Sequence, residues 1–141
     1  MINSPAVHLH LQMLQDVISR MAANSASAKT WCITLVSAIL VLTIEKNSLI
    51  PFYFYLFPIV LFYILDVYYL AYERAFREEY NQFVNGLENQ KDNLVKELDV
   101  FKIKPVGNIW TWRVKSIWSF STTGFYALLA VFVLVLGCSF S

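Results

Sequence analysis

The chain has 141 residues, of which 57% are hydrophobic, and a formal net charge of +1. This hydrophobic share lies above the roughly 45–50% of soluble domains and indicates a membrane protein. A net charge so close to zero gives no general argument for nucleic-acid binding, so the positions of the charges along the chain are more informative than their sum.

An amphipathic helix is predicted for residues 1–28. Apolar residues recur at alternating steps of four and three, which places them on one stripe of a helix; they are Val7, Leu11, Leu14, Ile18 and Met21. The other faces carry polar residues, namely His10, Gln12, Gln15, Asp16 and Ser19. The helix either lies on the inner membrane surface or packs against the cytoplasmic part of the chain. Capping residues at Asn24, Ser25 and Ser27 predict that the first span starts after them.

Three uncharged runs follow, Thr30 to Ile44, Asn47 to Leu65 and Ser116 to Ser141. A helix needs about 20 mostly apolar residues to cross a bilayer, so the second and third runs are long enough. The first becomes long enough if Lys29 and Glu45 extend their side chains to the two interfaces. The sequence therefore predicts an all-α membrane protein with three transmembrane helices, a hairpin in residues 29–72 and a third span in residues 119–141.

The distribution of Lys and Arg predicts the orientation of these spans. Basic residues precede the first span and are frequent between residues 74 and 115, whereas the loop after the first span offers only Lys46. By the positive-inside rule, the N-terminus and the middle region are cytoplasmic and the C-terminus is periplasmic.

Residues 73–118 are predicted to form a cytoplasmic helical region. Aromatic and aliphatic residues continue past the second span at two positions of a seven-residue repeat, which predicts that this span extends as a long helix, with a bend or a second helix after Leu87; they are Tyr69, Phe76, Tyr80, Phe83, Leu87, Leu94 and Phe101. Pro105 and Gly107 then break the helix before the chain returns to the membrane.

Ionisable side chains gather where the second span ends, and they are candidates for a pore or gate: Asp66, Glu73, Arg74 and Arg77. Ionisable groups at such a depth pair with one another or face a polar cavity. Pairing of Asp66 or Glu73 with Arg74 or Arg77 is one reading, and pore lining is the other. Thr34 and Ser37, on a polar line of the first span, likewise either pack against a helix or line a water path.

A basic and aromatic segment precedes the third span and supplies candidate ligand-binding residues: Lys102, Lys104, Trp110, Trp112, Arg113 and Lys115. Cations among tryptophans are typical of an anchor in the inner leaflet. The same residue types also hold single-stranded nucleic acid, by contacts with the backbone and stacking of the bases. Both readings stay open.

No catalytic constellation is present, because the chain has no nucleophile with a paired base and no glycine-rich phosphate loop. His8 and His10 point to different faces of a helix and no Cys or acid cluster completes a metal site. The sequence predicts neither an enzyme nor a bound metal or cofactor.

Several short motifs together resemble the RipA family of small bacterial inner-membrane proteins: Arg20-Met21-Ala22 with Asn24-Ser25, Lys29 and Trp31, Leu65-Asp66 with Tyr68-Tyr69-Leu70, Glu73-Arg74, Phe76-Arg77 with Tyr80, and Ser119-Phe120-Ser121 with Phe125-Tyr126. The resemblance covers most of the chain except about residues 82–110. It implies a homo-oligomer in the bacterial inner membrane. Similar proteins serve as effectors of anti-phage systems, including the Hailong system, whose effector resembles a channel held shut by a DNA oligomer.

This resemblance predicts a homo-oligomeric ion channel that depolarises the membrane during abortive infection. Its expected partners are membrane lipid and a nucleotide or single-stranded DNA oligomer made by a partner nucleotidyltransferase. The alternative is a non-conducting membrane scaffold or adaptor that acts through its cytoplasmic helix.

Overall fold

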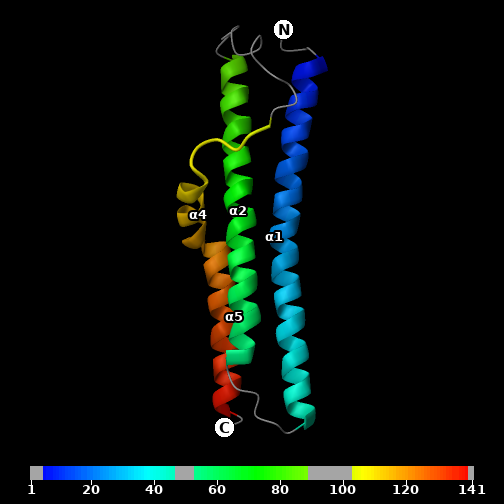
Figure 1. Cartoon of the computed structure of the whole chain (residues 1–141), viewed down its shortest axis with the longest axis vertical. Helices are drawn as coiled ribbons and strands as arrows, with labels where there is room; N and C mark the ends of the chain where they lie inside the picture. Colours follow the sequence, from blue (N-terminus) through cyan, green and yellow to red (C-terminus); the bar gives the residue numbers. More distant parts are fainter. Residues whose placement is uncertain (1–4, 47–52, 89–102, 140–141) are drawn as a thin grey trace.

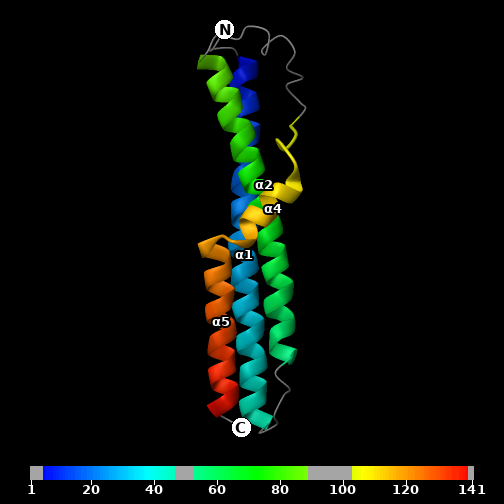
Figure 2. The same ribbon diagram turned by 90° about the vertical axis from the view of Figure 1, so that its left-hand side faces the viewer.

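The computed structural model describes residues 5–46, 53–88 and 103–139, in which every regular element is an α-helix. These are α1 (Pro5–Lys46), α2 (Tyr53–Glu88), α4 (Ile109–Ile117) and α5 (Phe120–Ser139). Helices α1 and α2 run antiparallel along the whole length of the molecule, and α5 lies beside one half of this pair (Figure 1). The short helix α4 crosses α2 near the middle (Figure 2).

Helix α1 is one continuous helix of 42 residues, roughly 63 Å at ~1.5 Å per residue. The predicted helix start after Ser27 is therefore wrong. After Pro5 the helix contains no glycine or proline that would break it. Ser25 does not act as a cap, because its hydroxyl faces α2 and donates a hydrogen bond to Asp66.

Helix α2 is also long, with 36 residues or about 54 Å. It continues from the second apolar run into the charged sequence without a break, as predicted, and passes through Pro58 and Gly86. The later members of the seven-residue repeat, Leu94 and Phe101, lie outside the described residues.

The two ends of the α1–α2 pair differ in the side chains that they expose. We call residues 5–28 of α1 with residues 69–88 of α2 the stalk, and residues 30–43 of α1 with residues 54–65 of α2 and α5 the apolar half. Within the described residues, Leu9 is the one large hydrophobic residue of the stalk that is exposed. The apolar half exposes many, including Ile33, Leu42, Phe57, Ile64, Leu128 and Val135.

Exposed apolar side chains at this density indicate contact with a membrane or with other proteins. Both α1 and α2 contain a window long and apolar enough to cross a membrane. Helices α4 and α5 meet that test only when they are taken together as one bent pair, with an angle of 48° between them. The prediction of a helical membrane protein is thus supported, with two spans by length and composition.

Three helices build the core of the apolar half. Its buried side chains come from α1 (Cys32, Val36), α2 (Tyr55, Ile59) and α5 (Tyr126, Val133). Helix α2 occupies the central position, because it packs against each of the other three helices. The Tyr126 hydroxyl donates to the Phe62 carbonyl at 3.1 Å and so satisfies a polar group inside this core.

In the stalk, the N-terminal half of α1 packs against the C-terminal half of α2, one of the two places predicted for the amphipathic helix. Val7 and Leu14 of its apolar stripe are buried. His10 is also buried and its ring lies 4.9 Å from that of Phe83, so its predicted place on a polar face is wrong. The Gln15 amide donates to the Tyr80 hydroxyl at 3.2 Å.

The chain between the stalk and α4 is non-helical over residues 103–108, as Pro105 and Gly107 predict. The Lys104 amide donates to Glu79 on α2 at 3.4 Å. Gly107 adopts a φ of 81°, and Asn108 then caps α4 by accepting from the Trp110 amide. This turn leads the chain into α4, which packs against α2.

Candidate functional site

The candidate site is centred on Asp66, whose carboxylate is fully buried between α1 and α2. Lys29 Nζ lies 2.7 Å from Asp66 Oδ2, and the buried Ser25 hydroxyl donates to Oδ1. Lys29 Nζ also donates to Ser25 Oγ at 3.3 Å. Ser25 and Lys29 are one helical turn apart on α1, so both reach α2 from the same face.

This arrangement differs from the predicted pairing, because Asp66 contacts neither Arg74 nor Arg77. Sequence reasoning considered partners on neighbouring turns of the same helix and assigned Lys29 to the membrane interface. The partner instead comes from α1, where Lys29 is about one-fifth exposed (22%). The Ser25 and Lys29 pair at four-residue spacing was the available signal, but only the antiparallel contact shows that Asp66 stands opposite.

The second predicted acid, Glu73, does pair with Arg77 along α2, with 2.8 Å between Arg77 Nη2 and Glu73 Oε1. Arg77 is 61% exposed, so water and salt weaken this pair. The Glu73–Arg77 pair lies on the surface of the stalk and is separate from the buried Asp66 group.

Arg74 has another role, because it holds the junction between α4 and α5. Its guanidinium donates to the Lys115 carbonyl and to the Ser119 hydroxyl, both at 3.1 Å. The last carbonyls of a helix lack intrahelical partners, and a cation there also interacts favourably with the helix dipole. On the same junction, the Ile117 carbonyl accepts from the Tyr63 hydroxyl at 3.3 Å and from the Thr123 hydroxyl.

Two hydroxyl residues proposed for a water path, Thr34 and Ser37, are exposed on α1 away from the three-helix core. The Thr34 hydroxyl donates to the Thr30 carbonyl at 2.9 Å, and the Thr30 hydroxyl donates to the Ala26 carbonyl at 3.2 Å. Such bonds satisfy the hydroxyl within its own helix. The polar line therefore lies on the outer surface of the single chain.

The predicted ligand-binding residues gather around α4, apart from Lys102, which lies outside the described residues. The Arg113 guanidinium lies over two rings, 5.3 Å from the centroid of Tyr68 and 5.2 Å from that of Trp110. Lys115 Nζ lies 5.0 Å from the Trp112 ring centroid, and the Trp112 indole donates to the Val106 carbonyl at 3.0 Å.

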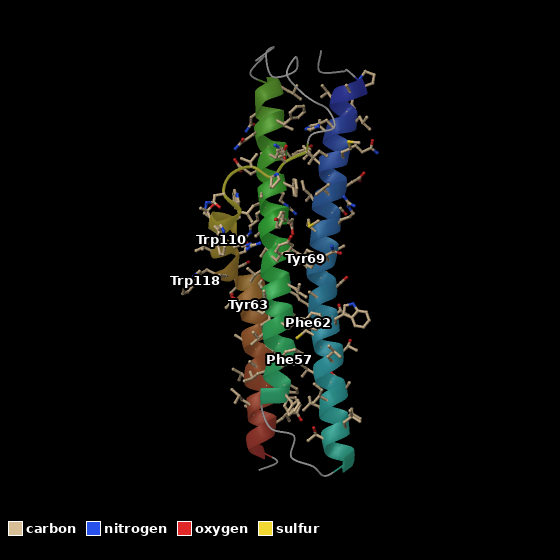
Figure 3. All side chains as sticks on the ribbon, viewed as in Figure 1. Phe57, Phe62, Tyr63, Tyr69, Trp110 and Trp118 are labelled. Carbon is tan, nitrogen blue, oxygen red and sulfur yellow. The ribbon has the colours of Figure 1, made fainter. Side chains whose placement is uncertain are left out.

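Side chains around the junction point in different directions (Figure 3). Phe62 and Tyr69 lie between α2 and α1, Tyr63 points toward α5, and Trp110 and Trp118 project from the outer side of α4. In the described part of the chain, no group of three or more His, Cys, Asp or Glu side chains is arranged to hold a metal ion.

Comparisons with known proteins find no family model, no curated protein and no solved structure that matches the chain. The resemblance to the RipA family therefore stays a prediction from the motifs.

Proposed function

We propose that this chain is one subunit of a homo-oligomeric ion channel in the bacterial inner membrane, the effector of an anti-phage system that kills the infected cell by depolarisation. The observation that carries the proposal is the buried group of Ser25, Lys29 and Asp66. It ties α1 to α2 at the level where the stalk joins the apolar half, so a change in the stalk would be transmitted to the membrane helices.

The proposed topology has three spans. The apolar halves of α1 and α2 form two, and α5 forms the third, since its 20 residues reach about 30 Å and contain no charged side chain. The stalk and the N-terminus then lie in the cytoplasm and the C-terminus in the periplasm, in agreement with the positive-inside rule.

Conduction requires several copies of the chain. The interior of the apolar half is filled by packed side chains such as Val36, Ile59 and Val133, so one copy offers no water path along its axis. Thr34 and Ser37 are polar and exposed in this half. In an oligomer they would face either a neighbouring copy or the pore, because hydroxyls are more favourable at both places than against lipid.

The deciding experiment is K⁺ efflux from liposomes that contain the purified protein, with its oligomeric state measured in nanodiscs. Efflux from an oligomer supports the channel, whereas a monomer in both detergent and lipid overturns it. Asp66→Asn is expected to change the efflux, because it removes the charge that holds Lys29. Asp16→Asn, at an exposed position of the stalk, is the matched control and is expected to leave efflux unchanged.

Control by a ligand is a separate part of the proposal, which names a nucleotide or single-stranded DNA oligomer made by a partner nucleotidyltransferase. Short single-stranded DNA added to the same liposomes is expected to suppress the efflux. Efflux that is indifferent to DNA would retain the channel and reject this ligand.

A membrane scaffold is the second candidate. The stalk favours it, because an arm of about 35 Å with a polar exterior can contact other proteins outside the membrane. A scaffold predicts oligomers without efflux, and it predicts that expression in cells leaves a membrane-potential dye unchanged. The channel predicts depolarisation when the chain is expressed without its partner enzyme.

A further inference from the structure

Helix α4 lies at the level where the apolar half ends and bends by 48° into α5. In Figure 2 it lies obliquely across α2, above and to one side of the start of α5. A short helix in this position is at the depth of the lipid headgroups when α5 crosses the membrane. This placement rests on the membrane topology and does not require conduction.

The outward face of α4 is strongly apolar. Trp110, Val114 and Trp118 follow one another at four-residue steps and are 68%, 56% and 85% exposed. Phe120, at the start of α5, is 94% exposed. Tryptophan is favoured at membrane interfaces because its ring is apolar while its N–H forms hydrogen bonds. A lipid surface therefore suits this face better than water does.

The charged side chains within residues 103–139 are all basic. Between residues 103 and 139 the chain contains Lys104, Arg113 and Lys115 and no Asp or Glu. Lys115 is exposed in the last turn of α4, whereas Lys104 lies further along the stalk, where its amide donates to Glu79. Basic groups beside interfacial tryptophans attract acidic lipid headgroups.

We propose that α4 is an interfacial helix that binds acidic phospholipid, with Trp110, Val114 and Trp118 inserted at the boundary of the acyl chains and Lys115 paired with headgroup phosphate. The neighbouring Arg113 makes cation–π contacts with Tyr68 and Trp110, and its contact with Tyr68 links α4 to α2. Membrane charge would thereby position the junction that Arg74 holds.

Single-stranded DNA is the competing occupant of this surface, and the geometry favours lipid. Bases bind such segments by stacking on free ring faces. Arg113 lies over the Trp110 ring and Lys115 lies over the Trp112 ring. The more exposed Trp118 is separated from Lys104 by the length of α4.

The test is native mass spectrometry of the full-length protein in detergent, with phosphatidylglycerol or phosphatidylcholine added. The wild type is expected to retain phosphatidylglycerol preferentially. Lys115→Gln is expected to weaken this binding by about fivefold, the factor that corresponds to ~1 kcal/mol for one basic group near an acidic lipid surface. Arg20→Gln, at an exposed position of the stalk, is the control and is expected to retain the lipid.

A second measurement tests insertion. In a variant with Trp118 as the single tryptophan, lipid brominated near the headgroup is expected to quench the emission more than lipid brominated deep in the acyl chain. Equal retention of the two lipids, an unquenched Trp118, or DNA binding that Lys115→Gln abolishes would each overturn the proposal. None of these readouts measures ion flux, so the lipid site and the channel can fail independently.

Discussion

Lys29 and Asp66 form an ion pair between α1 and α2, with 2.7 Å between Nζ and Oδ2 and no solvent exposure of the acid. Breaking a buried pair by removing one partner is costly because the other charge is left without compensation. Replacing both partners by apolar residues avoids that cost.

Asp66→Leu is therefore expected to destabilise the protein by about 3 kcal/mol, as is typical when one partner of a buried pair is removed. Lys29→Met combined with Asp66→Leu is expected to regain most of that stability. Thermal unfolding in detergent measures each variant and completes a double-mutant cycle. A double variant as unstable as the sum of the single ones would show that the two charges are not coupled.

Arg74→Gln is expected to loosen α4, because the Lys115 carbonyl and the Ser119 hydroxyl lose a charged donor. A hydrogen bond to a charged group contributes about 1.5–3 kcal/mol. Hydrogen exchange of the amides of residues 109–117 should accelerate accordingly. Arg77→Gln removes an exposed pair and serves as the control, with an expected change below ~1 kcal/mol. Equal exchange in the two variants would remove Arg74 from its role at the junction.

Leu14→Ala tests the packing of the stalk, since Leu14 is fully buried between α1 and α2. A large-to-small change at such a position costs about 2–5 kcal/mol. Hydrogen exchange should therefore increase in the stalk more than in the apolar half. Leu9→Ala is the matched control, because Leu9 is 43% exposed and its change is expected to cost far less. Similar effects of the two variants would contradict the observed packing.

Gly107→Ala is expected to destabilise the turn before α4 by about 1–2 kcal/mol, because the left-handed backbone conformation is less favourable by this free energy for a residue with a Cβ atom. Its φ is 81°, and an added Cβ would lie 3.5 Å from the Trp112 indole nitrogen. Gly124→Ala is the control: it lies within α5, where alanine is favoured by about 1 kcal/mol. Thermal unfolding compares them, and a neutral Gly107→Ala would rule out a conformational requirement at this turn.

Much of the architecture follows from the sequence by itself. Long uncharged runs and a high apolar content predict apolar helices of membrane-spanning length, because a helix needs about 20 mostly apolar residues to cross a bilayer. The repeat through Phe76 and Phe83 determines that α2 continues past Asp66, and Pro105 with Gly107 determines where the chain stops being helical. These features depend on local periodicity and backbone preference, which are set by residues close together in the sequence.

Only the tertiary structure decides which side chains of different helices face each other. Lys29 and Asp66 are distant in the chain, and the antiparallel contact of α1 with α2 brings them together. The same contact buries His10 and turns Ser25 from a predicted cap into a hydrogen-bond donor inside a continuous helix. Residue type states which groups need a partner when buried, but the packing of helices selects the partner, because it sets which faces lose contact with solvent.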